Sequence, residues 1–513
     1  MWVDIGLAPA ALNCRPPFSF YFDIVDKHWK TKSANSVPLH RICTLARKQG
    51  AVQIWLESAA GRTDVSDEIN ALDQSHGGGG SAEAISLSFF TTATPIDAQN
   101  PASNADCLGQ LTLINYRKPT SSDFTTSYIY EAVLPAPCLR TEDGASKNLL
   151  NNFVTSIGTF KRQAMGQNYD IHGVYYSQQN GVTSVCAHAS LKMGLNTLGV
   201  CTPPITSGWI NTFLSQTPPF TGLSLNQIID VTNKFGIKAW IHDYTNQTGA
   251  KYISDLAAIL ESGYPALLVF TTGRAIEHVV TVFGHTRNSD EWHPQALPAY
   301  SGPASAQYYP SSTWTDHFLI HDDNFGPYYT LSSRALEFDP EVKAHYVVGL
   351  FRHDVNASAT YIEANASIIL THVLSATQGP SLCRWLDYIT QLKRTFIMRP
   401  ILIEKADYID HIKSALAHDQ SGASDTELKL LDSLPDIFWQ VEFSLPDLYT
   451  GNRSKLGEVM LDATLPSDPA DLLKLFVGMR LPSVFLDKDG NQYAFGIESH
   501  IPNYQTHSHN HQW

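Results

Sequence analysis

Alternating apolar and polar positions are the main pattern of the first part of the chain. Successive side chains of a strand point to opposite faces, so such alternation predicts half-buried strands. We expect a short helix at 38–47 and strands at 51–56, 84–90, 111–116 and 128–134. No catalytic or ligand-binding motif lies among these segments. Residues 1–150 are therefore predicted to form a β-rich accessory domain.

Helical and strand patterns alternate in the central part of the chain, residues 151–355. An apolar face at helical spacing begins at Val185 and predicts a helix from Cys186 to about Leu198. A polar and aromatic insertion at about 288–315 is expected to be either a lid or a surface loop. The other segments expected here are helices at 223–234 and 255–261, each followed by a helix-ending glycine, and strands at 237–241, 266–270, 277–284 and 318–321.

The last part of the chain, residues 356–513, mixes the two patterns again. Helices are expected at 359–370 and 426–431, a strand at 438–446, and a hairpin at 483–495 whose turn contains a glycine. We predict an α+β protein overall. A β-rich N-terminal region and an α/β C-terminal accessory domain would flank a central region that contains the best candidate residues for chemistry.

The composition is typical of a folded protein with large cores, because 43% of residues are hydrophobic and only 16% are charged. A length of 513 residues predicts roughly two to four domains. The formal net charge is −14 and no cluster of Lys or Arg occurs, so neither nucleic acid nor an anionic membrane is an expected partner. No apolar run is long enough to span a bilayer, and the N-terminus lacks the basic residues of a signal peptide.

The seven cysteines are widely scattered, and no two of them form a CxxC motif. This usage favours a reducing compartment and argues against a disulfide framework or a structural zinc site. We therefore expect a cytoplasmic protein, with no metal and no cofactor.

Histidine spacing gives no reason to change the expectation of no metal. His317 and His321 are four residues apart, but on a predicted strand that spacing is about 13 Å, too far for one ion. The histidines near the C-terminus would bind a metal only weakly, and a disordered tail explains them equally well. They are His500, His507, His509 and His511.

One cysteine occupies a chemically distinctive position. Cys186 falls in the first turn of its predicted helix, with Ser184 as the expected N-cap. The positive end of a helix dipole favours thiolate over thiol, and a glutamine on the preceding loop can donate to a developing oxyanion. A cysteine at a helix start is nevertheless more often a core residue than a nucleophile. Whether Cys186 is a core residue or a nucleophile therefore depends on the residues found downstream.

Two later residues complete a possible catalytic set in the order in which the chemistry needs them. His278 begins a predicted strand, and Asp322 ends the next predicted strand along the chain. An imidazole at a strand start can reach a helix N-terminus and take the thiol proton. A carboxylate at a neighbouring strand end can hold that imidazole in the required tautomer. Alone, His278 would be a strand-end histidine and Asp322 part of a solvated turn.

With these residues in view, the region from about 165 to 350 resembles the papain-like cysteine peptidases, most closely their bacteriocin-processing branch. The resemblance is carried by Gln178 or Gln179 with Cys186, by the run Leu-Glu-Ser-Gly-Tyr-Pro-Ala-Leu at 260–267, by His278-Val279-Val280, and by Asp322 followed by Gly326 and Pro327. The Gly-x-Pro step before an apolar strand, then His-Val-Val, is its most specific part.

The resemblance implies a papain-like core in which Cys186 is the nucleophile and His278 the general base and then acid. Asp322 would orient the imidazole, and Gln179 would donate to the oxyanion. Such families place the glutamine six residues before the cysteine, where this chain has Asn180. The alternatives left open are Gln178 and Asn180 for the oxyanion donor, and Asp323 and Asn324 for the orienting residue.

The function expected from this set is thiol hydrolysis, with a peptide or protein as substrate. A thioester can also be captured by an amine, so a transglutaminase-like acyl or amine transferase is one alternative. A non-catalytic papain-fold scaffold that binds a partner protein is the other. The large flanking regions make a regulatory protein partner a further expectation in either case.

Overall fold

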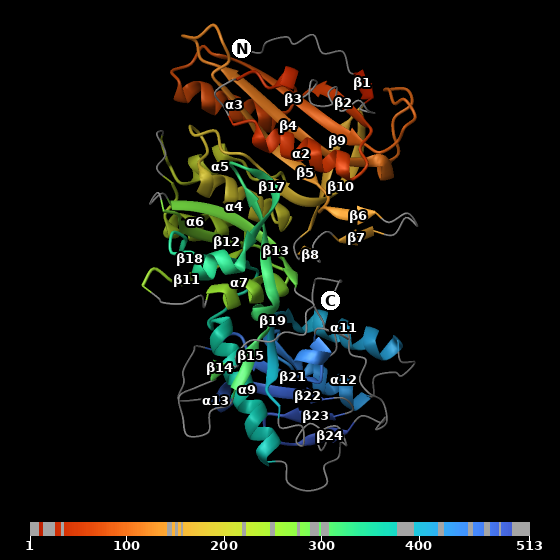
Figure 1. The fold of residues 1–513 in the computed structure, drawn as a ribbon, viewed down its shortest axis with the longest axis vertical. Helices are drawn as coiled ribbons and strands as arrows, with labels where there is room; N and C mark the ends of the chain where they lie inside the picture. The colour runs from red at the N-terminus through yellow and green to blue at the C-terminus, as the bar shows by residue number, and fades with distance from the viewer. Residues whose placement is uncertain are drawn as a thin grey trace.

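The computed structural model describes residues 10–13, 26–31, 35–140, 146–148, 152–154, 157–217, 222–246, 252–273, 277–287, 297–298, 307–376, 394–418, 425–449, 455–465, 472–481 and 484–494. Three large sheets follow one another along the long axis of the molecule (Figure 1). Helices cover them, so the fold is α+β. None of the helices in these ranges is long and apolar enough to cross a membrane. The C-terminal histidines considered above lie outside the described residues.

The N-terminal sheet is antiparallel, with the strand order β1-β2-β3-β4-β5-β10-β9. Its strands are β1 (Ala10–Asn13), β2 (Gln53–Ser58), β3 (Ser81–Phe90), β4 (Cys107–Arg117), β5 (Thr126–Leu134), β9 (Gly158–Ala164) and β10 (Gln167–Tyr176). Helix α2 (Val37–Lys48) packs on the face that carries Ile85, and α3 (Thr63–Ser75) packs on the opposite face, beside Ala84. The expected helix and strands of this region are confirmed.

The last two strands of this sheet come from a part of the chain that we had grouped with the central region. β9 and β10 form a hairpin, and β10 pairs with β5 through Val174 and Leu134. Sequence periodicity cannot reveal such a pairing because it joins strands about forty residues apart. A separate small sheet is formed by β6 (Cys138–Arg140) and β7 (Ser146–Asn148).

The central sheet is also antiparallel, with the order β11-β18-β12-β13-β16-β17. Strand β8 (Asn152–Val154) pairs with β13 beside this path. The strands are β11 (Lys238–Asp243), β12 (Ala266–Thr271), β13 (Glu277–Arg287), β16 (Thr315–Asp322), β17 (Gly326–Ser332) and β18 (Lys343–Phe351). The helices of this region are α4 (Cys186–Thr197), α5 (Ser207–Phe213), α6 (Leu225–Lys234), α7 (Tyr252–Glu261) and α8 (Ser333–Phe338).

Helix α4 lies between the N-terminal and central sheets. Ala189 and Met193 join the core of the N-terminal sheet, whereas Leu191 and Leu195 join a core with the central strands β12 and β18. Because both sides of the helix are covered, nearly all of its residues are buried. Its first residue, Cys186, is the partly exposed exception.

The C-terminal sheet has the order β14-β15-β19-β20-β21-β22-β23-β24. Its strands are β14 (Leu297–Pro298), β15 (Gln307–Pro310), β19 (Phe396–Glu404), β20 (Ile437–Ser444), β21 (Gly457–Asp462), β22 (Phe476–Leu481), β23 (Val484–Asp487) and β24 (Gln492–Ala494). Its helices are α9 (Ala359–Ala376), α11 (Lys405–His418), α12 (Asp425–Asp432) and α13 (Leu472–Leu475). The expected helices and hairpin of this region are confirmed.

The insertion at 288–315 differs from both of our expectations where it is described. Its strand β15 pairs in parallel with β19, and Tyr308 is buried in a core that the central and C-terminal sheets share. Burial of this aromatic side chain explains why the segment is a sheet edge and not a free loop. Residues 288–296 and 299–306 lie outside the described ranges.

A line of buried ion pairs also joins the central and C-terminal sheets. Glu261, at the end of α7, pairs with His285 of β13 at 2.7 Å and with Arg399 of β19. Arg399 then pairs with Glu442 of β20 at 2.5 Å, and Glu442 with Lys455 at 2.9 Å. All five side chains are at most 5% exposed, so no water screens these charges from one another.

Candidate active site

Cys186 is the first residue of α4, as the apolar pattern predicted, but Ser184 does not cap the helix. The N-cap is Val185, without a side-chain hydrogen bond, and the Ser184 hydroxyl is buried with no partner in the described part of the protein. The preceding loop is held instead by Asn180, whose Oδ1 accepts from the backbone N–H groups of Val182, Thr183 and Ser184. This side-chain turn fixes the backbone that leads to Cys186.

Two hydrogen bonds tie helix α4 to strand β13, which begins with the histidine of the candidate site. Ser190 Oγ donates to the carbonyl of Val279 at 2.9 Å, and Thr281 Oγ1 donates to the carbonyl of Ser190 at 3.0 Å. Both side chains are fully buried. The pair fixes the register of the helix against the strand, and with it the separation between Cys186 and His278.

His278 contacts both other members of the predicted set. Its Nε2 lies 3.0 Å from Asp322 Oδ2, and the Cys186 thiol is within hydrogen-bonding reach of the same ring. Since Asp322 occupies Nε2, Nδ1 is the nitrogen left for the thiol. Burial alone would lower the pKa of His278, but the hydrogen bonds to Asp322 and Cys186 and the charges of Asp322 and Asp323 outweigh it and raise that pKa to about 10.

Asp322 is anchored on its second oxygen. Oδ1 accepts from the backbone N–H groups of Asn324 at 2.8 Å and Phe325 at 3.1 Å, which leaves Oδ2 to face His278. Of the alternatives, Asp323 lies farther away, with Oδ1 3.7 Å from His278 Nε2, and Asn324 makes no contact with the ring among the described interactions. The geometry therefore favours Asp322 as the orienting group.

Asp323 is a second carboxylate beneath the imidazole. It is fully buried, and its Oδ2 has no hydrogen-bond partner in the described ranges. Burial and the charge of Asp322 raise the pKa of Asp323 to about 7, although the charge of His278 acts in the opposite direction. This carboxyl therefore changes charge near neutral pH.

The turn that carries these acids is held by the N-terminal sheet and α2. Tyr176 of β10 donates to the carbonyls of Asp322 and Asp323, and Arg41 of α2 donates to the carbonyls of Pro327 and Tyr328. Gly326 lies against α2 with φ +118°, and a Cβ there would come within 3.1 Å of the Arg41 side chain. Only glycine combines this conformation with so close an approach.

Tyr328 adds the strongest tie between this turn and the N-terminal sheet. Its hydroxyl donates to the carbonyl of Leu134 at 2.6 Å and accepts from the N–H of Val174 at 3.1 Å. We expected residues 1–150 to be an accessory domain without a chemical motif. In the described part of this region, Leu134 contacts Tyr328, so the N-terminal sheet helps β10 to position Asp322.

The three amide candidates for the oxyanion donor have different surroundings. Gln178 is buried, and both ends of its amide are used by the backbone of Ile129 and Asn35. The amide N–H groups of Asn180 donate hydrogen bonds to the side chains of Glu68 and Thr183.

Gln179 Nε2 donates to Asn324 Oδ1 at 2.9 Å, beside the acid, and its second N–H has no partner in the described part of the chain. The geometry thus favours Gln179 and gives Gln178 and Asn180 structural roles. The second N–H is the one that could reach an oxyanion.

The other described cysteines are poor candidates for reaction. Cys43, Cys107 and Cys201 are buried, and none forms a disulfide among the described residues. Burial raises the pKa of Cys107 and of Cys201 to about 12, so both are protonated thiols at neutral pH. His188, two residues after Cys186, is fully buried, and burial lowers its pKa to about 4. It bonds to Asn211 and is a neutral structural residue.

The same acids could also share a metal ion with the imidazole. One ligand atom from each of His278, Asp322 and Asp323 lies within 4.8 Å of the others. His278 Nε2 and Asp322 Oδ2 already share a hydrogen bond, so an ion held through these two atoms would displace that bond. The expectation of no metal stays a prediction.

Sequence reasoning found the three central residues because each sits at a recognisable element boundary. It missed Tyr176, Arg41 and Tyr328, which belong to ordinary strand and helix patterns. Their importance comes from contacts across more than a hundred residues, and no local signal could have revealed it.

The comparisons with known proteins leave the functional argument to this geometry. A scan against models of protein families found no match to the chain, and a search of curated proteins found none either. The catalytic roles of Cys186, His278, Asp322 and Gln179 therefore stay predictions.

Proposed function

We propose that this chain is a thiol hydrolase with a papain-like central region, which cleaves an amide bond of a peptide or protein. One observation supports this above all others: His278 is hydrogen-bonded to Asp322 and lies within reach of Cys186 at a helix N-terminus. A structural cysteine needs neither of these partners. The proposal includes a cytoplasmic setting, where scattered thiols stay reduced.

In the proposed first half-reaction, the Cys186 thiol gives its proton to His278. The thiolate attacks the substrate carbonyl carbon, a C–S bond forms, and the carbonyl oxygen becomes an oxyanion. The free N–H of Gln179 and the backbone N–H of Cys186 donate to it. Collapse breaks the C–N bond, and His278 transfers the proton to the departing amine.

In the second half-reaction, His278 takes a proton from water and the resulting hydroxide attacks the thioester. The C–S bond breaks, the acid product leaves, and the thiol is restored. Asp322 keeps the imidazole in one tautomer through both halves and stabilises its charged form. No metal or cofactor takes part in these proposed reaction steps.

The experiment that tests the proposal is labelling of the intact protein with limiting iodoacetamide at pH 6 in the presence of EDTA, followed by peptide mapping. Cys186 should react at least about a hundredfold faster than Cys43, Cys107 and Cys201, which serve as internal controls. His278→Ala should remove most of this advantage. If Cys186 reacts no faster in the native protein than these buried cysteines, the thiol mechanism is excluded and the scaffold alternative leads.

A second arm separates hydrolysis from transfer. Mixed reporter peptides would be incubated with the protein, with and without hydroxylamine, and the products identified by mass spectrometry. Free carboxylate products in both conditions support the hydrolase. Products that form only when the amine is present support an acyltransferase.

A further inference from the structure

The face of the N-terminal sheet beneath α3 changes character along its strands. Close to the helix it carries Ala84 and Tyr116, but farther along β3 and β4 it carries polar residues. These are Ser86, Ser88, Gln110 and Thr112, none more than 4% exposed. Polar side chains on a buried sheet face cost free energy unless they have partners. Their concentration at one place suggests a use other than packing.

A cavity of about 500 Å³ opens over this polar patch. Ser86 and Gln110 line it from the sheet, Glu57 and Arg62 from the end of β2 and the loop that follows, and Lys161, Arg162 and Gln163 from β9. Small-molecule sites are typically about 300–1,000 Å³ in volume. The cavity is thus large enough for a ligand of several heavy atoms.

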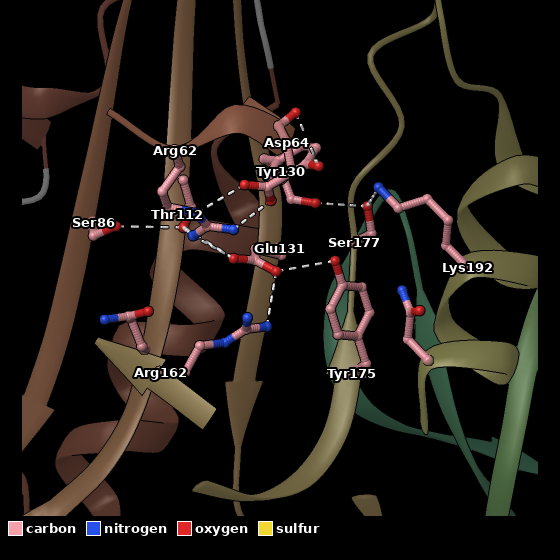
Figure 2. A network of polar contacts seen from close by, with 12 residues as sticks. Arg62, Asp64, Ser86, Thr112, Tyr130, Glu131, Arg162, Tyr175, Ser177 and Lys192 are labelled. Atoms are coloured by element: carbon pink, nitrogen blue, oxygen red, sulfur yellow. Dashed lines mark hydrogen bonds and ion pairs between the residues drawn. The ribbon is translucent and has the colours of Figure 1, made fainter. Parts of the chain in front are cut away.

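A buried carboxylate holds the two arginines of the cavity in place (Figure 2). Glu131 pairs through Oε1 with Arg62 at 2.6 Å and through Oε2 with Arg162 at 2.8 Å, and it also accepts from the Tyr175 hydroxyl at 3.1 Å. Burial would raise the pKa of Glu131, but the charges of Arg162 and Arg62 lower it to about 2. The carboxylate stays ionised and fixes both guanidinium groups.

The two arginines differ in what they have left to offer a ligand. Arg62 donates to both oxygens of Asp64 and to Thr112 as well as to Glu131, so its donors are largely used. Among the described interactions, Arg162 donates a hydrogen bond only through Nη2. Its guanidinium also lies over the rings of Phe160 and Tyr175, and these cation–π contacts use no N–H. A guanidinium has five N–H donors, so most of those of Arg162 remain available.

The other two charged residues of the cavity lining are Lys161 and Glu57. Lys161 precedes Arg162 on β9, where buried and exposed positions alternate, so its exposed side chain leaves the strand on the opposite face from Arg162. On the β2 side, Glu57 uses Oε2 to accept from the Trp55 indole and the Met165 N–H, while Oε1 has no described partner. The β9 wall therefore offers the donors of Arg162, and the β2 side offers a free carboxylate oxygen.

We propose that this cavity binds a small zwitterion, a free amino acid or a short peptide with both ends unblocked. Its carboxylate would receive the open N–H groups of Arg162, and its amine would donate to Glu57 Oε1. Gln110, whose Oε1 is also without a described partner, would accept from the ligand between the ends. A simple anion would leave Glu57 unmatched, and a simple cation would leave Arg162 unmatched.

Calorimetric titration tests this proposal with four probes: L-alanine, L-alanyl-L-alanine, N-acetyl-L-alanyl-L-alanine and L-alanyl-L-alanine amide. The full-length chain would carry Cys186→Ser, so that no probe is consumed and the result does not depend on the proposed hydrolysis. At least one zwitterion should bind, and blocking either end should weaken binding at least about tenfold, as expected for loss of a charged hydrogen bond. The two zwitterions distinguish an amino-acid site from a peptide site.

Two substitutions locate the binding. Arg162→Gln should weaken the unblocked probe, and Glu57→Gln should weaken it without weakening the N-acetylated one. Glu57 is only partly buried and forms no ion pair among the described residues, so Glu57→Gln keeps the test decisive even if Arg162→Gln destabilises the fold. Lys234→Gln, on α6 outside the cavity, is the matched control and should bind like the parent.

Three results would overturn the proposal. The first is no heat of binding with either zwitterion at millimolar concentration. The second is equal affinity for blocked and unblocked probes. The third is undiminished binding in the Arg162→Gln and Glu57→Gln variants, which would place the ligand elsewhere.

Discussion

At the scale of single residues, the two oxygens of one carboxylate have different partners in the candidate site. One oxygen of Asp322 accepts from two backbone N–H groups, and the other is hydrogen-bonded to His278. A side chain fixed in this way cannot rotate to follow solvent, so it holds the imidazole at little further entropic cost. The neighbouring Asp323 has no such anchors on its buried oxygen. Two adjacent acids therefore have different physical roles.

The raised pKa of His278 predicts how the reactivity of Cys186 depends on pH. With that pKa near 10, the imidazole stays protonated at neutral pH and can stabilise a thiolate beside it. The rate of Cys186 alkylation should thus be nearly flat from about pH 6 to 9. In His278→Gln the rate should instead climb steadily with pH, as that of an isolated thiol does. A climbing profile in the native protein would contradict the ion pair.

Asp323 gives a prediction about stability. Its folded-state pKa of about 7 lies above the ordinary value of 3.8, so its contribution to stability is present below pH 3.8 and is lost as the pH rises to 7. Asp323→Asn has no such loss. Between pH 4.5 and 6.5, the free energy of unfolding of the variant should rise relative to that of the native protein by up to about 3 kcal/mol, as measured by urea unfolding. The titration of His278 falls above this range. A difference that does not change with pH would refute the assignment.

At the scale of elements, α4 is the part that makes the site possible. It is covered on one side by the N-terminal sheet and on the other by the central sheet. Its N-terminal end, at Cys186, is thus the place where a residue of this helix can contact solvent and substrate. The reciprocal bonds between Ser190 and β13 then set how far Cys186 stands from His278.

Removing one of these bonds should disturb the site from a distance. Thr281→Val keeps the shape of the side chain but leaves a buried carbonyl with one donor fewer, which costs about 1–3 kcal/mol. We expect this loss in denaturant unfolding, and a severalfold lower rate of Cys186 alkylation at pH 6. Thr212→Val is the matched control, because the Thr212 hydroxyl is exposed and bonds within its own helix. Equal effects in the two variants would mean that the bond does not position the helix.

Much of the local structure, and the proximity of His278 to Asp322 and Cys186, could be predicted from the sequence. Helical spacing identified α4, and apolar runs identified β13 and β16, whose ends carry His278 and Asp322. The Ser184 cap was wrong because Asn180, four residues earlier, captures the same stretch of backbone. The cavity of the N-terminal sheet could not be predicted, because Glu57 and Arg162 meet only after β9 has folded back across the sheet.

At the scale of the whole molecule, buried charge and shared core join the parts. One hydrophobic core runs through the central and C-terminal sheets, and the ion pairs from His285 to Lys455 cross the same boundary. Such pairs add little stability compared with apolar residues, but breaking one leaves an uncompensated charge. The C-terminal region should therefore unfold together with the central one.

Arg399 offers the clearest test of this coupling. Arg399→Met leaves the buried carboxylates of Glu261 and Glu442 without their shared partner. The free energy of unfolding should fall by about 3–5 kcal/mol, and the protein should still unfold in one transition. Arg394→Met removes an exposed pair with Asp447 and should cost less than about 1 kcal/mol. Two separate transitions in the native protein would show that the sheets are independent.

The tie between Tyr328 and the N-terminal sheet limits how this protein can be divided. A fragment cut to residues 151–355 would retain Cys186, His278 and Asp322. It would lose Leu134, which receives the Tyr328 hydroxyl, and the strand beside β10. We therefore expect this segment not to fold into a competent site by itself, because the sheet that precedes it holds Asp322 in place.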